Sequence, residues 1–382
     1  MLSWKVSTIA MDFWLIVSIF LLLAPTSAFY QVNNTDHQKN SQAHGKRHLL
    51  EQQDEPCNKF HHNTEAVEKS AAKAKEMLLK HPTDVPIEDR LLVMILFSRG
   101  FTHEKEMSGR LEYLRCSLLK LKANMMPQTT IDIFIWALNS TESHPIIPGW
   151  FNAQDFPRMN IIGMEPETWR IPCGLVDDSQ WAVRKHFNID YYLMGRWRLT
   201  FSLDFAKAMG YKYHLQFDDD AMLNQKLSFD IVQKFREHNY LMGVFSDHIG
   251  EVPQCTLGLP ELTQYWLAIR KKQPKGPLYK HVNPPNMMGI NSAGWDRMYH
   301  PGYFIIIGVD WWFSEETQDY LTTVLRSGRD VEGRWQEQAV MNMMRLVLVP
   351  LEQLWIMTEV DIGHDRHNRN NFVEWCVKTG IV

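Results

Sequence analysis

Uninterrupted apolar runs mark the first strands expected along this chain. Residues 91–97 (LLVMILF) are wholly apolar and residues 131–138 nearly so, as in strands buried on both faces of a parallel sheet. A third, shorter strand is predicted at 159–164, and a helix at 104–122 separates the first two. This order indicates βαβ units, and such sheets bind ligands beyond the C-terminal ends of their strands.

From Asp190 the apolar residues recur at three- and four-residue steps as far as Ala208. This spacing predicts one amphipathic helix, which Asp190 caps and Gly210 ends. The remaining pattern predicts helices at 227–237, 260–271, 314–326 and 335–344 and strands at 240–245, 303–309 and 346–349. Residues 272–301 hold five prolines and are predicted to be largely irregular. The whole is an α/β pattern with a mostly parallel sheet flanked by helices.

The most informative strand is predicted at 211–217, where apolar and polar residues alternate. It runs directly into Asp218, Asp219 and Asp220. Three adjacent like charges repel one another, so a fold that gathers them usually places a cation there. Carboxylate oxygens suit Mg²⁺, Mn²⁺ or Ca²⁺. The alternative is an acidic surface turn.

The N-terminus predicts a route into the secretory pathway. Lys5 precedes an apolar run from Phe13 to Ala24, and small residues follow near Ala28. We therefore expect a signal peptide or signal-anchor at 1–28, attached to the membrane if it is not cleaved. Residues 29–85 are polar and are expected to form a stem with one helix at 64–79, ahead of a single catalytic domain at 86–382.

Composition narrows the function classes further. The chain has 382 residues with 40 basic and 44 acidic side chains, which argues against nucleic acid as a partner. Sequons at Asn33 and Asn139 agree with a lumenal location. The five cysteines show no C-x-x-C spacing, so a zinc site is not expected. An oxidising lumen would allow up to two disulfides, with one thiol left over.

Basic residues near the predicted strand ends are candidates for binding phosphate. Arg99 follows the strand at 91–97, and Arg196 and Arg198 lie one helix before the acidic triplet. Guanidinium groups at these places suit a diphosphate, although each is equally consistent with a solvated surface charge. Asp247 follows the strand at 240–245 and is a further candidate.

Several motifs together resemble the fungal α-1,2-mannosyltransferases of the glycolipid 2-α-mannosyltransferase type. The strand that ends in Asp218-Asp219-Asp220 is similar to that family's strand ending in Glu-Pro-Asp, with which such enzymes hold a metal against a diphosphate. The order of the motifs holds from about residue 190 to 365. The other matching segments are Tyr191-x-x-Met194-x-Arg196-Trp197, Ser327-Gly328, Arg334-Trp335, Pro350 and Asp361-Ile362-Gly363-His364.

The resemblance implies a GT-A-like nucleotide-sugar transferase fold and a type II or secreted enzyme of the Golgi lumen. Its donor would be a nucleotide sugar, GDP-mannose, used with Mn²⁺ or Mg²⁺, and its acceptor a glycan or glycoprotein. By the same resemblance Asp218, Asp220 and His364 bind the metal. Asp219, Arg99 and Arg196 are the residues predicted on the donor side.

The resemblance also suggests which residues act on the acceptor. Glu337 falls on the family's aspartate after Arg-Trp, near the acceptor, so Glu337 or Asp247 would accept the acceptor's proton or orient its hydroxyl. One departure is clear: the stretch 286–291 (NMMGIN) lacks the carboxylate that the family has there. A front-face route needs no such carboxylate. The alternative functions are a secreted metal-dependent phosphohydrolase and a Ca²⁺-binding lectin-like module.

Overall fold

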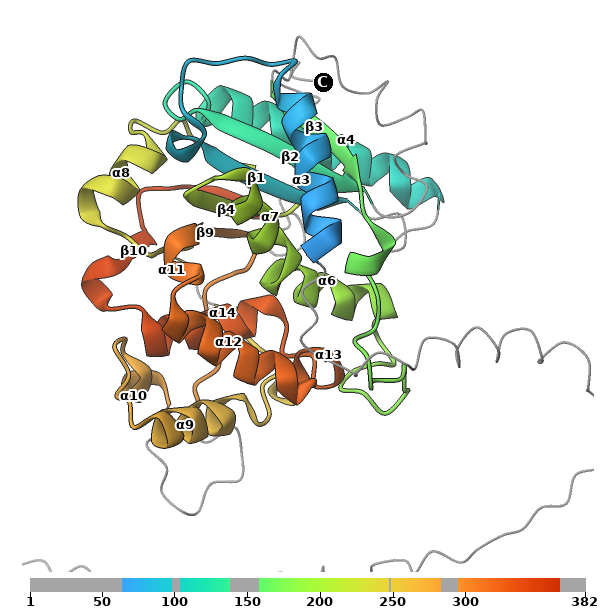
Figure 1. The fold of residues 1–382 in the computed structure, drawn as a ribbon, viewed down its shortest axis with the longest axis vertical. Coiled ribbons are helices and arrows are strands. Elements are labelled where there is room, and N and C mark those ends of the chain that lie inside the picture. The colour runs from blue at the N-terminus through green and yellow to red at the C-terminus, as the bar shows by residue number, and fades with distance from the viewer. Residues whose placement is uncertain (1–63, 98–103, 138–157, 247–248, 283–294, 365–382) are drawn as a thin grey trace, which may run out of the picture. The chain divides into compact units, whose positions relative to one another are not determined.

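The computed structural model describes residues 64–97, 104–137, 158–246, 249–282 and 295–364. Their centre is a seven-stranded sheet of order β10-β6-β9-β4-β1-β2-β3 (Figure 1). Only β9 runs antiparallel to its two neighbours, so the predicted mixed, mostly parallel sheet is confirmed. In chain order the strands are β1 (Leu91–Phe97), β2 (Ile131–Ala137), β3 (Met159–Gly163), β4 (Tyr213–Phe217), β6 (Met242–Phe245), β9 (Phe304–Gly308) and β10 (Leu354–Met357).

Strand β1 shows why its sequence is apolar throughout. Its odd residues, such as Val93 and Ile95, pack into one hydrophobic cluster with α4 (Glu104–Asn124) and α8 (Ile231–His238). Its even residues, such as Leu92 and Met94, pack into a second cluster on the other face of the sheet. Successive side chains of a strand point to opposite faces, so helices on both faces require apolar residues at every position.

The second cluster is formed by α3 (Thr64–Leu78), α6 (Ile189–Leu199) and α7 (Phe201–Met209), which cover that face of β1 and β2 (Figure 1). A third cluster lies around β6 and β9 and contains residues of α9, α10, α11, α12 and α14. Their bounds, with that of the short α13, are α9 (Leu259–Arg270), α10 (Leu278–His281), α11 (Val309–Trp312), α12 (Glu315–Ser327), α13 (Arg329–Glu332) and α14 (Glu337–Leu348).

Two sequence predictions are corrected here. The helix expected from Asp190 to Gly210 is two helices, because the backbone of Thr200 leaves helical geometry (φ −122°, ψ −86°) between α6 and α7. Asn188 caps α6, while Asp190 accepts a hydrogen bond from the indole of Trp169 at 2.9 Å. Gly210 ends α7 with a left-handed φ of 93°, as predicted.

The strand predicted at 346–349 is wrong: these residues form the end of α14 and its C-cap. Every residue of α14 from Ala339 to Leu348 is buried. An apolar run carries no period when all sides are covered, so it fits a buried helix as well as a strand. The edge strand β10 follows instead, after Pro350.

The N-terminal helix predicted in the stem is present as α3, and its residues Val67 and Ala71 pack against the sheet-bearing part of the chain. The predicted signal segment at 1–28 lies outside the described residues, so the boundaries at 28 and 85 stay predictions. Cys116 and Cys173 each take part in a disulfide bond, and Cys255 is a buried free thiol. Within the described ranges no helix is both long and apolar enough to cross a bilayer.

A buried charge cluster surrounds Asp132 of the sheet. The carboxylate of Asp132 on β2 is fully buried and accepts hydrogen bonds from Arg158, from Arg90 at 3.4 Å and from the Tyr211 hydroxyl at 2.6 Å. Removing one member of such a group leaves the other charges buried and uncompensated.

We therefore expect Asp132→Ala to lower the free energy of unfolding by about 3–5 kcal/mol, measured by urea denaturation. Asp310→Ala is the matched control, since Asp310 is 75% exposed and pairs with Lys212 on the surface. It should cost no more than about 1 kcal/mol. Equal losses in the two variants would contradict the role given to Asp132.

Candidate active site

The acidic triplet lies at the C-terminal end of β4, in the middle of the sheet. Asp218 follows the last residue of β4, and the chain then enters the short strand β5 (Ala221–Leu223). Strand β5 pairs antiparallel with β11 (Ile362–His364), which places His364 opposite Ala221. This pairing brings a histidine from near the end of the chain beside two aspartates that lie far before it in sequence.

Asp218, Asp220 and His364 form a compact group. One ligand atom from each lies within 4.8 Å of the others, and His364 Nε2 is 3.1 Å from Asp220 Oδ1 and 3.5 Å from Asp218 Oδ2. Tyr303 stacks on the imidazole at 4.6 Å between ring centroids, which fixes its plane. Burial alone would lower the pKa of His364, but its hydrogen bonds to the two aspartates raise it to about 9.

Hydrogen bonds from α4 hold the turn that carries the aspartates. The hydroxyl of Ser117 on α4 lies 3.2 Å from the carbonyl oxygen of Asp219 and 2.5 Å from that of Ala221. Asp219 itself is buried. These contacts fix the backbone on both sides of Asp220, so the positions of the metal-binding candidates are set by the sheet and by α4.

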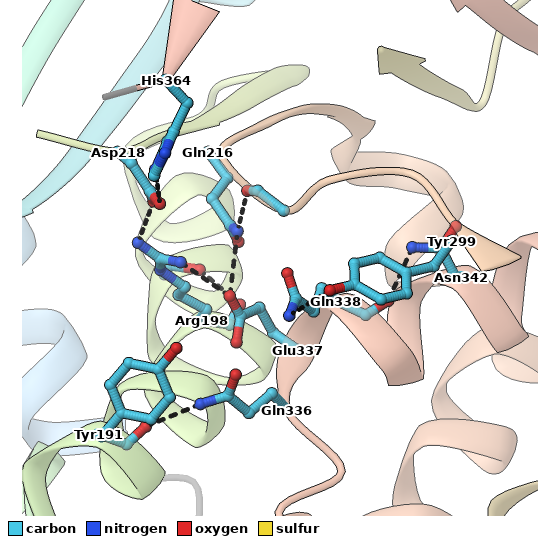
Figure 2. Close-up of polar contacts among 12 residues, drawn as sticks. Tyr191, Arg198, Gln216, Asp218, Tyr299, Gln336, Glu337, Gln338, Asn342 and His364 are labelled. Atoms are coloured by element: carbon cyan, nitrogen blue, oxygen red, sulfur yellow. Dashed lines mark hydrogen bonds and ion pairs between the residues drawn. The ribbon is translucent and has the colours of Figure 1, made fainter. Parts of the chain in front are cut away.

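Arg198, in the last turn of α6, connects this group to a third carboxylate. Its Nη2 donates to Asp218 Oδ1 at 2.5 Å and its Nη1 donates to Glu337 Oε1 at 2.7 Å (Figure 2). Burial alone would raise the pKa of Asp218, but Arg198 and His364 hold it well below its ordinary value. Burial alone would lower the pKa of Arg198, and its two carboxylate partners raise it instead.

Glu337 is the first residue of α14 and is buried. Its Oε1 also lies 3.5 Å from the Gln216 amide nitrogen, which donates to the carbonyl of Gly302 at 2.5 Å. Among the described residues, its Oε2 has no hydrogen-bond partner. One oxygen of Glu337 is thus fixed by Arg198 and Gln216, and the other is buried without a hydrogen-bond partner among the described residues.

Polar and aromatic groups surround the start of α14. Gln336 donates to the carbonyl of Tyr191 at 3.2 Å, and Gln338 donates to the Tyr299 hydroxyl at 3.1 Å and to Glu251 at 3.2 Å (Figure 2). Burial and the nearby carboxylates raise the pKa of Tyr299. Amides and tyrosines beside a buried carboxylate are groups that bind and orient hydroxylated ligands.

The structure brings together four of the predicted site residues: Asp218, Asp220, His364 and Glu337. Arg196 lies elsewhere, because its guanidinium pairs with the buried Asp330 of α13 at 2.6 Å. Arg196 rather than Arg198 was predicted on the donor side, and no signal in the sequence singled out Gln216. Arg99 and Asp247 lie outside the described residues, and so does the 286–291 stretch.

Two carboxylates and one imidazole, each offering an atom to a common point, fit a divalent cation of the Mg²⁺ and Mn²⁺ kind. Arg198 leaves Asp218 Oδ2 facing His364 and Asp220, so the guanidinium and a cation would use different oxygens of the same carboxylate.

The sheet order and the cluster at the end of β4 define the class of fold, which is the GT-A type of nucleotide-sugar glycosyltransferases. Two solved structures with this fold are fungal mannosyltransferases. Core-mannan synthase A (CmsA/Ktr4) from Aspergillus fumigatus, in a Mn/GDP form, matches with a TM-score of 0.61 and 12% identity over 74% of this chain and 77% of that one. Mannosyltransferase Ktr4p from S. cerevisiae, in complex with GDP, matches with a TM-score of 0.58 and 13% identity over 85% and 86%.

At these identities the similarity establishes the fold, and it confirms the predicted GT-A-like architecture. No protein-family model matches the chain, and no curated protein gives a significant match.

Proposed function

We propose that this chain is a lumenal, metal-dependent glycosyltransferase that moves mannose from GDP-mannose onto a hydroxyl of a glycan or glycoprotein, in an α-1,2 linkage. The observation that carries the proposal is the cluster of Asp218, Asp220 and His364 at the C-terminal end of β4. That edge is where open α/β sheets bind their ligands. The solved mannosyltransferases with this fold include forms with GDP and with manganese and GDP, which supports the donor and the metal.

The side chains present fit the steps of such a transfer. When bound by the three ligands, Mn²⁺ or Mg²⁺ would stabilise the negative charge that develops on the leaving diphosphate as the sugar–phosphate bond breaks. The acceptor hydroxyl loses its proton as the new glycosidic bond forms. Glu337 Oε2 accepts that proton, while Arg198 and Gln216 hold Oε1 and so orient the carboxylate.

The cellular location is part of the proposal. The apolar segment before Ala28 and the sequons at Asn33 and Asn139 fit a type II Golgi membrane protein, or a secreted one if the segment is cleaved. The disulfide-bonded Cys116 and Cys173 fit an oxidising compartment.

A thermal-shift screen of nucleotide sugars with Mn²⁺ tests the donor class. A ligand at a hundred times its Kd stabilises a protein by about 2.7 kcal/mol, so GDP and one GDP-sugar should raise Tm by several degrees. Chelator should abolish both shifts. Binding of Ca²⁺ with no change in Tm on adding GDP or a nucleotide sugar would favour the lectin-like alternative. Hydrolysis of the donor at the same rate with and without sugar acceptors would favour the phosphohydrolase.

Gly195 supplies a test of the geometry around Glu337. A Cβ added at Gly195 of α6 would lie 3.1 Å from Glu337 Oε2 and 3.3 Å from the Gln336 Cα, closer than ordinary contacts. We expect Gly195→Ala to lower the rate of sugar transfer about tenfold while the free energy of unfolding changes by no more than about 1 kcal/mol, because alanine also favours the helix.

The control for this prediction is Gly250→Ala, since a Cβ at Gly250 meets no atom of the described part of the chain within 4 Å. Initial rates of transfer and urea unfolding curves should be measured for both variants. If Gly195→Ala and Gly250→Ala transfer sugar at the same rate, the space beside Glu337 Oε2 is not needed for the reaction.

A further inference from the structure

The guanidinium of Arg198 lies between two carboxylates that have different tasks in the proposed reaction. Nη2 holds Asp218 at 2.5 Å, and Nη1 holds Glu337 at 2.7 Å (Figure 2). The side chain is only 7% exposed, so both contacts are shielded from water. Such charge-assisted contacts are strong and directional, because the planar guanidinium presents its donors in a fixed fork.

The two oxygens of Asp218 have different neighbours: one contacts Arg198, and the other faces the candidate metal ligand His364. Oδ1 accepts from the guanidinium, and Oδ2 lies 3.5 Å from His364 Nε2. Both oxygens share one negative charge. Whatever part of this charge Arg198 neutralises is therefore withheld from a cation at Asp218, Asp220 and His364.

Glu337 sets how strongly Arg198 acts on Asp218. In the protein as it stands, one positive charge is shared by two carboxylates. Without the charge of Glu337, Asp218 alone would neutralise the guanidinium and would attract a cation less. Without Arg198, no cation of the protein would neutralise the Oδ1 side of Asp218, and Asp218 would attract a bound cation more.

We propose that Arg198 is a positioning residue that couples cation binding at Asp218 to the charge and orientation of Glu337. Arg198 acts through these two carboxylates, and both of its terminal nitrogens are engaged by them. The kinetic part of this inference rests on the proposed function, whereas the part on cation affinity does not.

A double-mutant cycle read by Mn²⁺ affinity tests the coupling, with free Mn²⁺ followed by electron paramagnetic resonance. Arg198→Gln should bind Mn²⁺ about tenfold more tightly than the wild type, and Glu337→Gln about tenfold more weakly. In the Arg198→Gln background, Glu337→Gln should change the Mn²⁺ Kd by less than about threefold. Arg270→Gln, which removes a surface partner of Asp319, is the matched control and should leave the Kd unchanged.

Weaker Mn²⁺ binding in Arg198→Gln would overturn the proposal, and so would an equal effect of Glu337→Gln in both backgrounds. An arginine that only supports the fold would lower Tm without this pattern of affinities.

Arg198→Lys tests whether the planar guanidinium is needed to hold both carboxylates, because lysine keeps the charge but concentrates it on one ammonium group. We expect kcat to fall about tenfold, with the donor KM and the Mn²⁺ Kd within about threefold of the wild type and Tm unchanged. An unchanged kcat would overturn the positioning role. If Arg198→Gln does not fold, the kcat of Arg198→Lys still tests the positioning role of Arg198. If the wild type transfers no sugar, the proposed function fails, and the Mn²⁺ cycle still tests the coupling.

Discussion

Asp220→Asn should lower both sugar transfer and donor hydrolysis by at least about a thousandfold while the protein remains folded. Asp220 is buried, lies 3.1 Å from His364 Nε2 and belongs to the group that can hold a cation. Loss of a single preorganised donor to a developing negative charge already costs about 10²–10³ in rate, and loss of the cation removes more than one such interaction. Asparagine keeps the size of the side chain but not its charge.

The measurement compares initial rates at saturating GDP-sugar and Mn²⁺ with the rates of Asp310→Asn. Asp310 has a carboxylate that is 75% exposed and forms an ion pair with Lys212. Its variant should keep the wild-type rate, and Tm should be similar in all three proteins. Full activity of Asp220→Asn, or wild-type activity undiminished by chelator, would exclude a metal-dependent transfer at this site.

Glu337→Gln should lower kcat for transfer by about 10²–10⁴ at saturating Mn²⁺, which is the range for loss of a general base. Glutamine can still accept from Arg198, but its amide cannot take a proton from the acceptor. The donor KM should stay within about threefold of the wild type, since Glu337 is assigned to the acceptor. The donor should still raise Tm in the thermal-shift assay.

Glu316→Gln is the matched control for this variant. Glu316 also lies in the first turn of a helix and also has basic partners, Lys272 at 2.7 Å and Lys275, but these lysines are 37% and 52% exposed. It should retain the wild-type kcat. A Glu337→Gln protein as active as Glu316→Gln would require another group to accept the proton, and Asp247 is the other candidate from the sequence.

Much of the site was predictable wherever the pattern is local. The alternation at 211–217 predicted β4, and the sequence itself attaches Asp218 to the end of that strand. His364 and Glu337 were predicted from the resemblance of short motifs, not from their spacing. Nothing in the sequence period shows that β11 pairs with β5, because pairing between distant strands depends on the assembled sheet.

The choice between the two arginines shows where sequence reasoning fails. Two residues apart on a helix differ by about 200° in direction, so Arg196 and Arg198 point to nearly opposite sides. Both were candidates for the diphosphate, and Arg196 was the one predicted on the donor side. The packing of α6 turns Arg196 toward Asp330 of α13 and Arg198 toward Asp218 and Glu337.

The sequence by itself determined the strands of the sheet other than β10, and the acidic end of β4, because burial on two faces and strand alternation are recorded in local periodicity. It did not determine the end of α14, since a helix covered on all sides loses that periodicity. Only the tertiary structure decided that Arg198 links Asp218 to Glu337. That contact depends on how α6 and α14 pack beside the end of β4, and such packing joins residues that are 20 and 139 positions apart.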